Sequence, residues 1–585
     1  MKNRLSRPAL ALLSLALTVS FVFAQQPAPR RGEARTSPNA PGATAPRGAR
    51  DRARSAPNAT SVLEEDFAEA LSIVQDNYVD GVKLDYNTVF KSSIIGMLRS
   101  LDPHSNYYDA KEFEELQTDW RSEYFGVGAS IINHDVNGET STFVLATFEN
   151  SPAARAGLRY GDKILAVDGK DAKGKSSAEV RDWIRGPKGS TVKMSLERAA
   201  SGAKETVAIT RDVVPQPTVP DAYMIKPGVG YIDMQRGFNR TTADEFIERL
   251  EQLHKQGMTQ LVVDLRNNPG GLLDQAVKVA ERFLARGQLI LSQRGRIEGA
   301  DRSYNSSNSN PDAIPLVVLV NRNTASASEI VAGALQDHDR AIVVGETSFG
   351  KGLVQSIIPM DYGTALTLTS TKYYTPSGRL IQRDYSNEGL YDYYTKGQGV
   401  GGGDNAGAAG QKPTGPESLT DTGRKVYGGG GISPDDAVKP RLITPAQQRI
   451  ADPIFGFVRE LVNGRVRGFE DYKVTRGIEF DHVLKADEYT VTDNLFKAFK
   501  AYATTAAAGD EANKLTDAQL DKARDFIARQ MRFEIATAVY GTVGASQVLV
   551  ADDPQVSKAV EALPRARELA AAALRGRNPQ SKSFE

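Results

Sequence analysis

The chain has 585 residues, of which 40% are hydrophobic and 25% are charged, an ordinary balance for a globular protein with room for several domains. Its 72 lysines and arginines equal its 72 aspartates and glutamates, so the overall charge does not favour a nucleic-acid partner. The sequence holds no cysteine, which excludes disulfides, thiolate metal sites, a cysteine nucleophile and a lipid anchor on cysteine.

The N-terminus predicts an exported protein. Three basic residues precede an apolar run over 9–23, and small residues suited to a cleavage site end at Ala24. This pattern is typical of a signal peptide over 1–24, for export to the periplasm or cell envelope. The alternative is an uncleaved, membrane-associated anchor, but the run is shorter than the roughly 20 residues of a spanning helix. We see no second apolar stretch long enough to span a bilayer.

Two segments separate this leader from the folded domains. Residues 25–60 are rich in proline, alanine, glycine, serine and arginine, which predicts a disordered basic linker. Residues 61–118 predict an N-terminal helical region, because Phe67, Leu71 and Val74 recur at helical spacing.

Residues 119–213 predict a small β-rich domain. Val192, Met194 and Leu196 alternate with polar residues, as a half-buried strand requires. Ser176 and Glu179 have the spacing of a helix capping box.

Residues 214–440 change to alternating strands and helices, which favours a layered α/β core with buried strands. Thr242 with Glu245 predicts the cap of one helix. A glycine-rich loop over 397–414 interrupts this core. Residues 441–585 predict a C-terminal helical extension, with helices beginning near Thr516 and Asp553, and no catalytic group stands out there.

Ser326 is the candidate nucleophile. It lies where a predicted strand ends and a helix begins, between the small residues Ala325 and Ala327. The free N–H groups of a first helical turn lie near such a position. Taken alone, a serine here is more often an N-cap than a nucleophile.

Lys351 is the candidate general base, because none of the five histidines lies in a triad motif and no Gly-x-Ser-x-Gly elbow is present. Burial lowers the pKa of a lysine and can keep it neutral. Gln355 lies four residues on and is positioned to hydrogen-bond the lysine amine. For the oxyanion hole we expect the N–H of Ala327 with that of Gly270 or Gly271.

Several blocks of this sequence resemble the signature blocks of the carboxyl-terminal processing (tail-specific) serine proteases, in that family's order. These blocks are residues 101–105, 151–153, 156–158, 161–162, 264–272, 326–330, 350–355 and 429–435. The resemblance covers about residues 62–440. It implies Ser326 as nucleophile, Lys351 as general base and Gln355 as the residue that positions Lys351. It also implies a multidomain α/β protein with a crotonase-like core and an inserted PDZ-like domain. Thr324 departs from the family, where glycine or serine is common.

A second resemblance concerns the start of the β-rich domain, which is similar to a PDZ carboxylate-binding loop. The expected peptide-binding residues are Tyr124, Phe125, Gly126, Val127, Gly128 and Ala129. Their N–H groups would hold a chain-terminal carboxylate, and the next strand would add a peptide by β-augmentation. The expected partners are protein substrates with apolar C-terminal tails. No cofactor or metal is expected, and a homo-oligomer or an adaptor protein stays open.

Two other functions compete with this interpretation. The chain could be a catalytically silent PDZ scaffold. Residues 345–351 also nearly match a phosphate-binding P-loop, but Gly352 stands where serine or threonine is needed and the next residues are β-like. We interpret His104 as structural, with its side chain satisfying local backbone groups.

Overall fold

The computed structural model describes residues 59–136, 139–386, 393–394, 415–505 and 515–577. The predicted signal peptide, nearly all of the linker 25–60 and the glycine-rich loop 397–414 lie outside these residues. The chain divides into two compact units, and the division between Leu101 and Asp102 falls inside the predicted helical region 61–118.

The smaller unit is helical. It holds α1 (Ala59–Asn77), the 3₁₀ turn η1 (Gly81–Lys83) and α2 (Tyr86–Arg99). Asp85 caps α2, since its carboxylate accepts the N–H of Asn87. Apolar side chains of α1, among them Leu63 and Phe67, are exposed.

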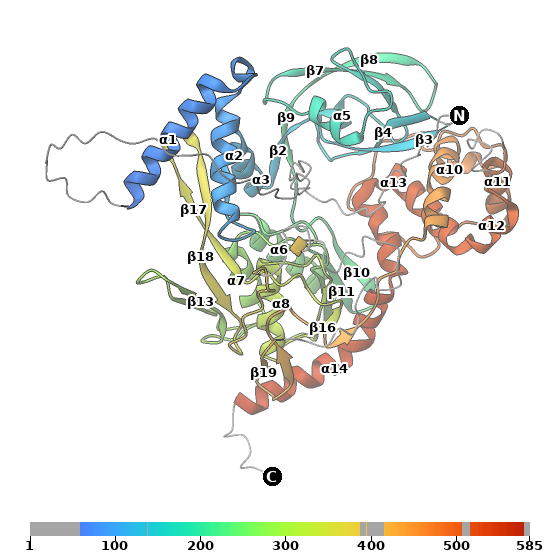
Figure 1. The fold of residues 1–585 in the computed structure, drawn as a ribbon. Coiled ribbons are helices and arrows are strands. Elements are labelled where there is room, and N and C mark those ends of the chain that lie inside the picture. Colours follow the sequence, from blue (N-terminus) through green and yellow to red (C-terminus); the bar gives the residue numbers. More distant parts are fainter. Residues whose placement is uncertain (1–58, 137–138, 387–392, 395–414, 506–514, 578–585) are drawn as a thin grey trace, which may run out of the picture. The chain divides into compact units, whose positions relative to one another are not determined.

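A six-stranded sheet forms the centre of the larger unit (Figure 1), in the order β10-β11-β12-β15-β16-β21. All of its neighbouring strands are parallel except the pair β10–β11. The strands are β10 (Ala222–Lys226), β11 (Val229–Asp233), β12 (Gln260–Asp264), β15 (Leu316–Val320), β16 (Ile342–Gly345) and β21 (Asp436–Ala437).

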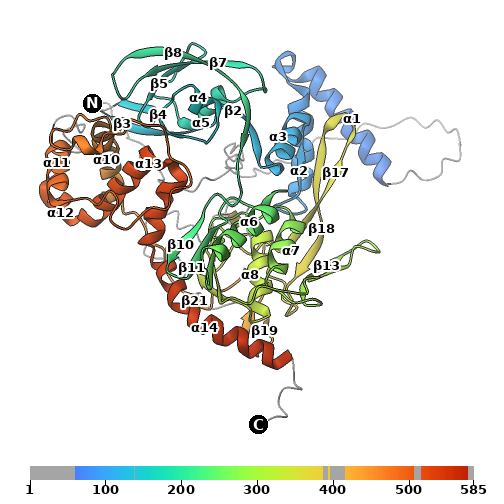
Figure 2. The ribbon, with the colours of Figure 1, turned by 180° about the vertical axis from the view of Figure 1, so that it is seen from behind.

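Both faces of this sheet are buried, because its strands carry apolar side chains on both sides. One face packs against α6 (Thr242–Lys255), α7 (Leu273–Glu281) and α8 (Ala327–Asp337). The other face is covered by α14 (Pro554–Arg577), which runs along the sheet in Figures 1 and 2. The expected β-α-β order and buried strands are confirmed, and the layers place the carboxyl ends of β12 and β15 beside the start of α8.

A second, five-stranded sheet adjoins this core. Its order is β1-β18-β13-β14, and β17 also pairs with β18. The strands are β1 (Asn106–Tyr108), β13 (Leu289–Gly295), β14 (Arg302–Asn305), β17 (Leu353–Pro359) and β18 (Ala365–Tyr374), with the turn η2 (Asp361–Gly363) after β17. The segment before the β-rich domain therefore adds β1 to a sheet of the core.

The β-rich domain follows α3 (Ala110–Trp120). Its main sheet has the order β3-β4-β5-β7-β8, β6 pairs with β5, and β2 pairs with β9 as a ribbon. The elements are β2 (Glu123–Gly126), β3 (Ala129–Val136), β4 (Glu139–Thr147), α4 (Pro152–Arg155), β5 (Lys163–Val167), β6 (Lys170–Asp171), α5 (Ser177–Ile184), β7 (Thr191–Glu197), β8 (Lys204–Thr210) and β9 (Asp212–Pro215). The capping box of Ser176 and Glu179 is confirmed at α5.

The C-terminal residues are largely helical, as expected. After the short pair β19 (Glu417–Leu419) and β20 (Lys425–Tyr427), the elements are α10 (Pro445–Val462), η3 (Glu470–Tyr472), α11 (Asp493–Ala503), α12 (Asp517–Lys522), α13 (Arg524–Ala551) and α14. Among the described residues, α13 alone is long and apolar enough to cross a membrane, and 83% of its apolar window is buried inside the protein. The expectation that no second stretch reaches this length is therefore wrong, and the burial is typical of a core helix.

The C-terminal helices pack on both of the other domains. Phe143 and Tyr160 of the β-rich domain pack against Phe455 of α10. The Tyr160 hydroxyl donates to Glu534 of α13 at 2.8 Å, and burial raises the pKa of that carboxyl group. On the core side, Leu563 of α14 is fully buried against the central sheet. The extension therefore ties the β-rich domain to the core.

One predicted cap is wrong. The Thr242 hydroxyl accepts the N–H of Asn239 at 2.8 Å, and the Glu245 carboxylate accepts the N–H of Val219 at 2.8 Å. Spacing alone predicts a capping box here, but Glu245 instead fixes the segment that enters β10.

Candidate active site

Ser326 lies between β15 and α8, directly before the first residue of the helix. Its φ of 57° is in the left-handed region, which is strained for a residue other than glycine. A Cβ built on Gly270 would lie 2.7 Å from the Ser326 Cβ. Only glycine fits at that position, so the glycine turn after β12 closes directly on the candidate nucleophile.

Glu329 holds the backbone on both sides of this site. Its side chain is fully buried, and its Oε2 accepts the N–H groups of Ser326 and Lys351, both at 2.8 Å. Its Oε1 accepts the N–H of Gly350 at 2.6 Å and the hydroxyl of Ser348. Burial raises the pKa of Glu329, while these donors oppose the rise. One carboxyl group therefore joins the serine turn to the lysine loop.

Lys351 lies in the loop between β16 and β17. Burial lowers its pKa from the usual 10.5 to about 8, while the carboxylates of Glu329 and Asp102 act in the opposite direction. A lysine with this pKa is substantially neutral in mildly alkaline solution. The residues after it form the strand β17 instead of the helix that a P-loop needs, which overturns the nucleotide-binding alternative.

The glycine-rich block 429–435 packs against the loop that carries Lys351. A Cβ on Gly350 would lie 2.9 Å from the backbone N of Gly431, and one on Gly431 would lie 2.5 Å from the Ser348 carbonyl oxygen. Ser348 also exchanges hydrogen bonds with Ile432, through its N–H and its hydroxyl. The close approach of these backbones explains the glycines at 350 and 431.

Gln355 lies on β17, opposite Thr369 of β18. Its carboxamide N–H donates to the Thr369 hydroxyl at 3.0 Å. In the described part of the chain it forms no hydrogen bond with Lys351, so the expected contact with the lysine amine is not made in this structure.

The two glycines expected in the oxyanion hole, Gly270 and Gly271, differ in whether their N–H group already has an acceptor. The N–H of Gly270 donates to the carboxamide oxygen of Asn268 at 2.9 Å, so it is already engaged. The N–H groups of Gly271 and Ala327 have no acceptor among the described residues. The geometry therefore leaves Gly271 and Ala327 as the free donors near Ser326.

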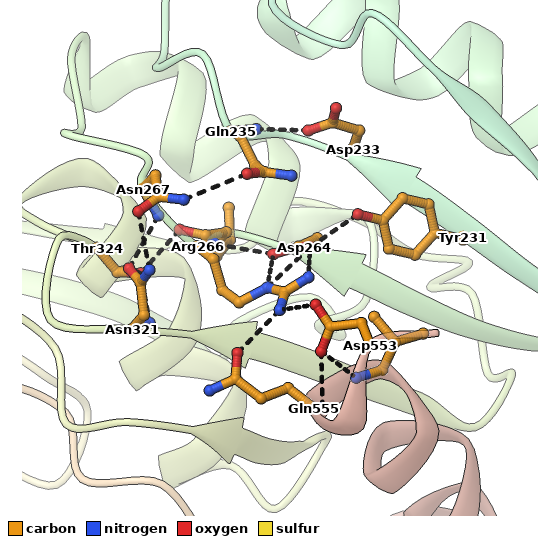
Figure 3. A network of polar contacts seen from close by, with 12 residues as sticks. Tyr231, Asp233, Gln235, Asp264, Arg266, Asn267, Asn321, Thr324, Asp553 and Gln555 are labelled. Carbon is orange, nitrogen blue, oxygen red and sulfur yellow. Dashed lines mark hydrogen bonds and ion pairs between the residues drawn. The ribbon is translucent and has the colours of Figure 1, made fainter. Parts of the chain in front are cut away.

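A polar network behind this glycine turn connects it to the C-terminal extension (Figure 3). The Arg266 guanidinium pairs with Asp264 at 2.6 Å and with Asp553 at 2.6 Å, and it donates to Gln555 at 2.8 Å. Burial, with the Asp264 charge, raises the pKa of the neighbouring Asp233 to about 6. Asp553 directly precedes α14, so this helix is fixed to the base of the turn.

His104 is buried beside the lysine loop. Its Nε2 contacts the Tyr393 hydroxyl at 2.8 Å. Burial, helped by the charges of Lys351 and Arg383, lowers its pKa to about 2, so the imidazole is neutral. The partner of its side chain is a distant tyrosine and not the local backbone that we expected.

The predicted peptide-binding residues 124–129 span the end of β2, the loop after it and the start of β3. Burial raises the pKa of Tyr124 to about 12, and the nearby Gly128 N–H opposes this rise. A Cβ on Gly126 would lie 2.7 Å from the Tyr124 ring, so the ring covers this glycine. The Tyr124 side chain therefore lies beside the backbone expected to hold a carboxylate.

The remaining geometry of the loop suits a peptide. The carbonyl of Val127 accepts the N–H of Ala153 at 2.7 Å, and that of Gly128 accepts the Ser151 hydroxyl at 2.9 Å. Both carbonyls thus face the domain interior. The adjoining β3 is an edge strand, since it pairs only with β4. An edge strand presents free N–H and C=O groups to an extended chain.

Sequence reasoning missed Glu329 and Thr369. The Ser-x-x-Glu spacing from Ser326 to Glu329 has the form of a capping box and could have drawn attention to the glutamate. Thr369 gives no comparable signal, because its link to Gln355 depends on strand register.

Comparison with known proteins identifies the family of this chain. The family model of peptidase family S41 matches residues 228–388, and that of the PDZ domain matches residues 145–198. The carboxy-terminal-processing protease of Bartonella bacilliformis is 38% identical over 322 residues, which are 54% of this chain and 72% of that protein. The carboxyl-terminal-processing protease of a Picosynechococcus species is 39% identical over 278 residues, 47% of this chain and 66% of that protein.

Among solved structures, the photosystem II D1 C-terminal processing protease is 29% identical and covers 64% of this chain and 92% of its own, with a TM-score of 0.32. That superposition is too poor to carry an argument. The family assignment depends on the matched sequences, which include the segments of Ser326 and Lys351. This chain belongs to peptidase family S41, the carboxy-terminal processing proteases, and is a serine protease with a PDZ domain.

Proposed function

We propose that this protease is an endopeptidase of the cell envelope that binds the C-terminal tails of protein substrates and cleaves them through an acyl-enzyme on Ser326. Lys351 is the general base, and Ala327 with Gly271 forms the oxyanion hole. The single observation that carries the proposal is the position of Glu329. It binds the backbone N–H groups of both Ser326 and Lys351, so one buried carboxyl group fixes the backbone of the nucleophile and that of the base.

The chemistry follows from this arrangement. Neutral Lys351 takes the proton of the Ser326 hydroxyl as the serine oxygen attacks the substrate carbonyl carbon. The N–H groups of Ala327 and Gly271 stabilise the negative oxygen of the tetrahedral intermediate. Lys351 then gives the proton to the departing amine, and later activates the water that hydrolyses the ester. Burial, which lowers the pKa of Lys351 to about 8, supports this role.

The PDZ domain supplies the tail specificity in this proposal. The substrate carboxylate binds the amides of residues 126–128, and the tail adds to the free edge of β3. The Tyr124 hydroxyl lies near the Gly128 N–H and then competes with the carboxylate for it. Apolar tails are favoured, because β3 begins with the partly buried apolar side chains of Ala129 and Ile131.

Three further expectations belong to this proposal. The N-terminal pattern supports export with a signal peptide over 1–24. The central parallel sheet with helices on both faces supports a crotonase-like core. The exposed apolar side chains of α1 support a homo-oligomer, which light scattering of the wild type and of Phe67→Glu would test.

Mass spectrometry of cleavage products tests the proposed function. A loosely folded protein with an apolar C-terminal tail is incubated with the wild type, Ser326→Ala and Lys351→Ala. A matched substrate has the same tail with an amidated C-terminus. We expect cleavage by the wild type alone, reduced for the amidated tail. Cleavage by Ser326→Ala would overturn the mechanism, and equal cleavage of both substrates would overturn carboxylate recognition.

The alternative is a catalytically silent PDZ scaffold. It predicts that the wild type binds the tail but leaves it intact, and that a fluorophosphonate probe never labels Ser326. The lowered pKa of Lys351 argues against it, because a protein that only binds peptides does not need a buried lysine that is readily deprotonated.

A further inference from the structure

The turn 102–105, which precedes β1, is closed by hydrogen bonds to Asp102. Asp102 is 6% exposed and Ser105 is 5% exposed. The Oδ1 atom of Asp102 accepts the N–H groups of His104 and Ser105, both at 2.8 Å. Its Oδ2 atom accepts the Ser105 hydroxyl at 2.6 Å. Because the single hydroxyl proton of Ser105 is given to Asp102, the Ser105 oxygen can only accept further hydrogen bonds.

Ser105 uses this acceptor on the sheet that holds Gln355. Its Oγ accepts the N–H of Thr369 at 3.0 Å. The neighbouring residue Asn106 pairs with Thr367 where β1 meets β18. The Ser105 side chain thus continues the β1–β18 ladder and fixes the backbone of Thr369.

Thr369 in turn fixes the side chain opposite it. Its hydroxyl accepts the carboxamide N–H of Gln355 at 3.0 Å, across the β17–β18 pair. In the described part of the chain no hydrogen bond engages the Gln355 carbonyl oxygen. With its N–H held by Thr369, the carboxamide has an acceptor to offer a lysine ammonium or amine.

We infer that the turn 102–105 is a positioning device for the general base: through Ser105 and Thr369 it holds Gln355 so that the Gln355 carbonyl oxygen can receive a hydrogen bond from Lys351. The inference rests on the proposed Ser326/Lys351 chemistry. It gives the segment before the PDZ domain a function in catalysis, because this segment adds β1 to the sheet that holds Gln355.

The turn also acts on Lys351 through charge. The carboxylates that act on Lys351 are Glu329 and Asp102, and both raise its pKa against the effect of burial. The basic groups near the turn are His104, which is neutral, and Arg383, whose pKa is lowered by burial. The turn therefore lies within electrostatic reach of the base through Asp102.

We call the hydrogen bonds that lead from Ser105 through Thr369 to Gln355 the relay. Three threonine variants of β18 test it. Thr369→Val removes the acceptor of Gln355, and Thr369→Ser keeps it. Thr371→Val is the matched control, because Thr371 lies on the same strand, is 8% exposed, and its buried hydroxyl has no hydrogen-bond partner among the described residues. Each variant is compared with the wild type and Lys351→Ala for kcat, KM and the rate of Ser326 labelling by a fluorophosphonate, between pH 6 and 10.

We expect Thr369→Val to lower kcat and the labelling rate about 10- to 100-fold with little change in KM, because a misplaced base loses reactivity but not binding. Thr369→Ser should recover most of the loss, and Thr371→Val should match the wild type. For Asp102→Asn, the midpoint of the rise of kcat/KM with pH should move to lower pH, because a carboxylate that raises the pKa of Lys351 is removed.

The relay is wrong if Thr369→Val and Thr371→Val behave alike, or if Asp102→Asn leaves that midpoint unchanged. Failure of the underlying chemistry is distinguishable, since Lys351→Ala would then keep its activity. If Lys351→Ala is inactive while Thr369→Val is fully active, the dyad stands and the relay falls.

Discussion

Replacement of Glu329 by glutamine is the perturbation whose effect the structure predicts most sharply. The Glu329 carboxylate accepts four hydrogen bonds, two on each oxygen. Glutamine keeps the shape but turns one of the two acceptors into a donor. The less costly orientation points the new amide at Ser348 and Gly350, because the Ser348 hydroxyl can rotate to accept. The Gly350 N–H cannot adapt, and it loses its partner.

The magnitude follows from the kind of bond that is lost. A hydrogen bond to a charged group contributes about 1.5–3 kcal/mol, and about 1.4 kcal/mol corresponds to a tenfold change in an equilibrium constant. Opening of the Gly350 amide should therefore become about 10- to 100-fold easier. The Ser326 and Lys351 amides, which face the retained oxygen, should keep most of their protection. Glu329→Ala, which removes both oxygens, should release all three.

Hydrogen–deuterium exchange read by mass spectrometry with single-residue fragmentation measures these amides separately. The Phe349 N–H is an internal control, because it donates to the Thr324 carbonyl and does not contact Glu329. Faster exchange at Gly350 with an unchanged Phe349 is the expected result for Glu329→Gln. Unchanged exchange at Gly350, or equal acceleration at Phe349, would refute the assignment of Glu329 as the local link between the serine turn and the lysine loop.

Three further predictions concern the base, the PDZ loop and the C-terminal extension. The kcat/KM of the wild type should rise with pH through a midpoint of about 8, because only neutral Lys351 can take a proton, and a flat profile from pH 7 to 9 would contradict this. Tyr124→Phe should tighten binding of a free-carboxylate peptide about 2- to 10-fold by removing the hydroxyl near the Gly128 N–H, as calorimetry would measure, and weaker binding would contradict the competition. Leu563→Ala should destabilise the protein by about 2–5 kcal/mol in thermal unfolding, whereas the control Leu574→Ala on the same helix, 56% exposed, should stay within about 0.5 kcal/mol; equal effects would contradict the packing of α14 on the sheet.

Features that depend on neighbouring residues could be predicted from the sequence. The alternation of Val192, Met194 and Leu196 is a buried face of β7, and the caps at Ser176 and Thr516 form as their spacing predicts. In each case the pattern and the structure it predicts lie within a few residues of each other. The strand–helix junction at Ser326 could be found for the same reason.

Features that depend on distant segments could not be predicted. Gln355 was expected to contact the lysine four residues away, but its carboxamide N–H goes to Thr369, across a strand pair whose register the sequence does not reveal. His104 contacts Tyr393, which lies 289 residues further along the chain. The helices after residue 443 carried no functional motif, yet Asp553 ends up paired with Arg266 behind the glycine turn. Tertiary packing decides such contacts, and local spacing carries no information about them.

The most direct test of the central claim is to trap the acyl-enzyme. Wild-type enzyme is mixed with an excess of tailed substrate and quenched in acid within the first turnover, and its peptides are mapped by mass spectrometry. The account predicts an ester between the Ser326 oxygen and the new C-terminus of the amino-terminal substrate fragment, absent from Ser326→Ala and Lys351→Ala. Substrate cleavage in the same samples by an enzyme without Ser326 would contradict it.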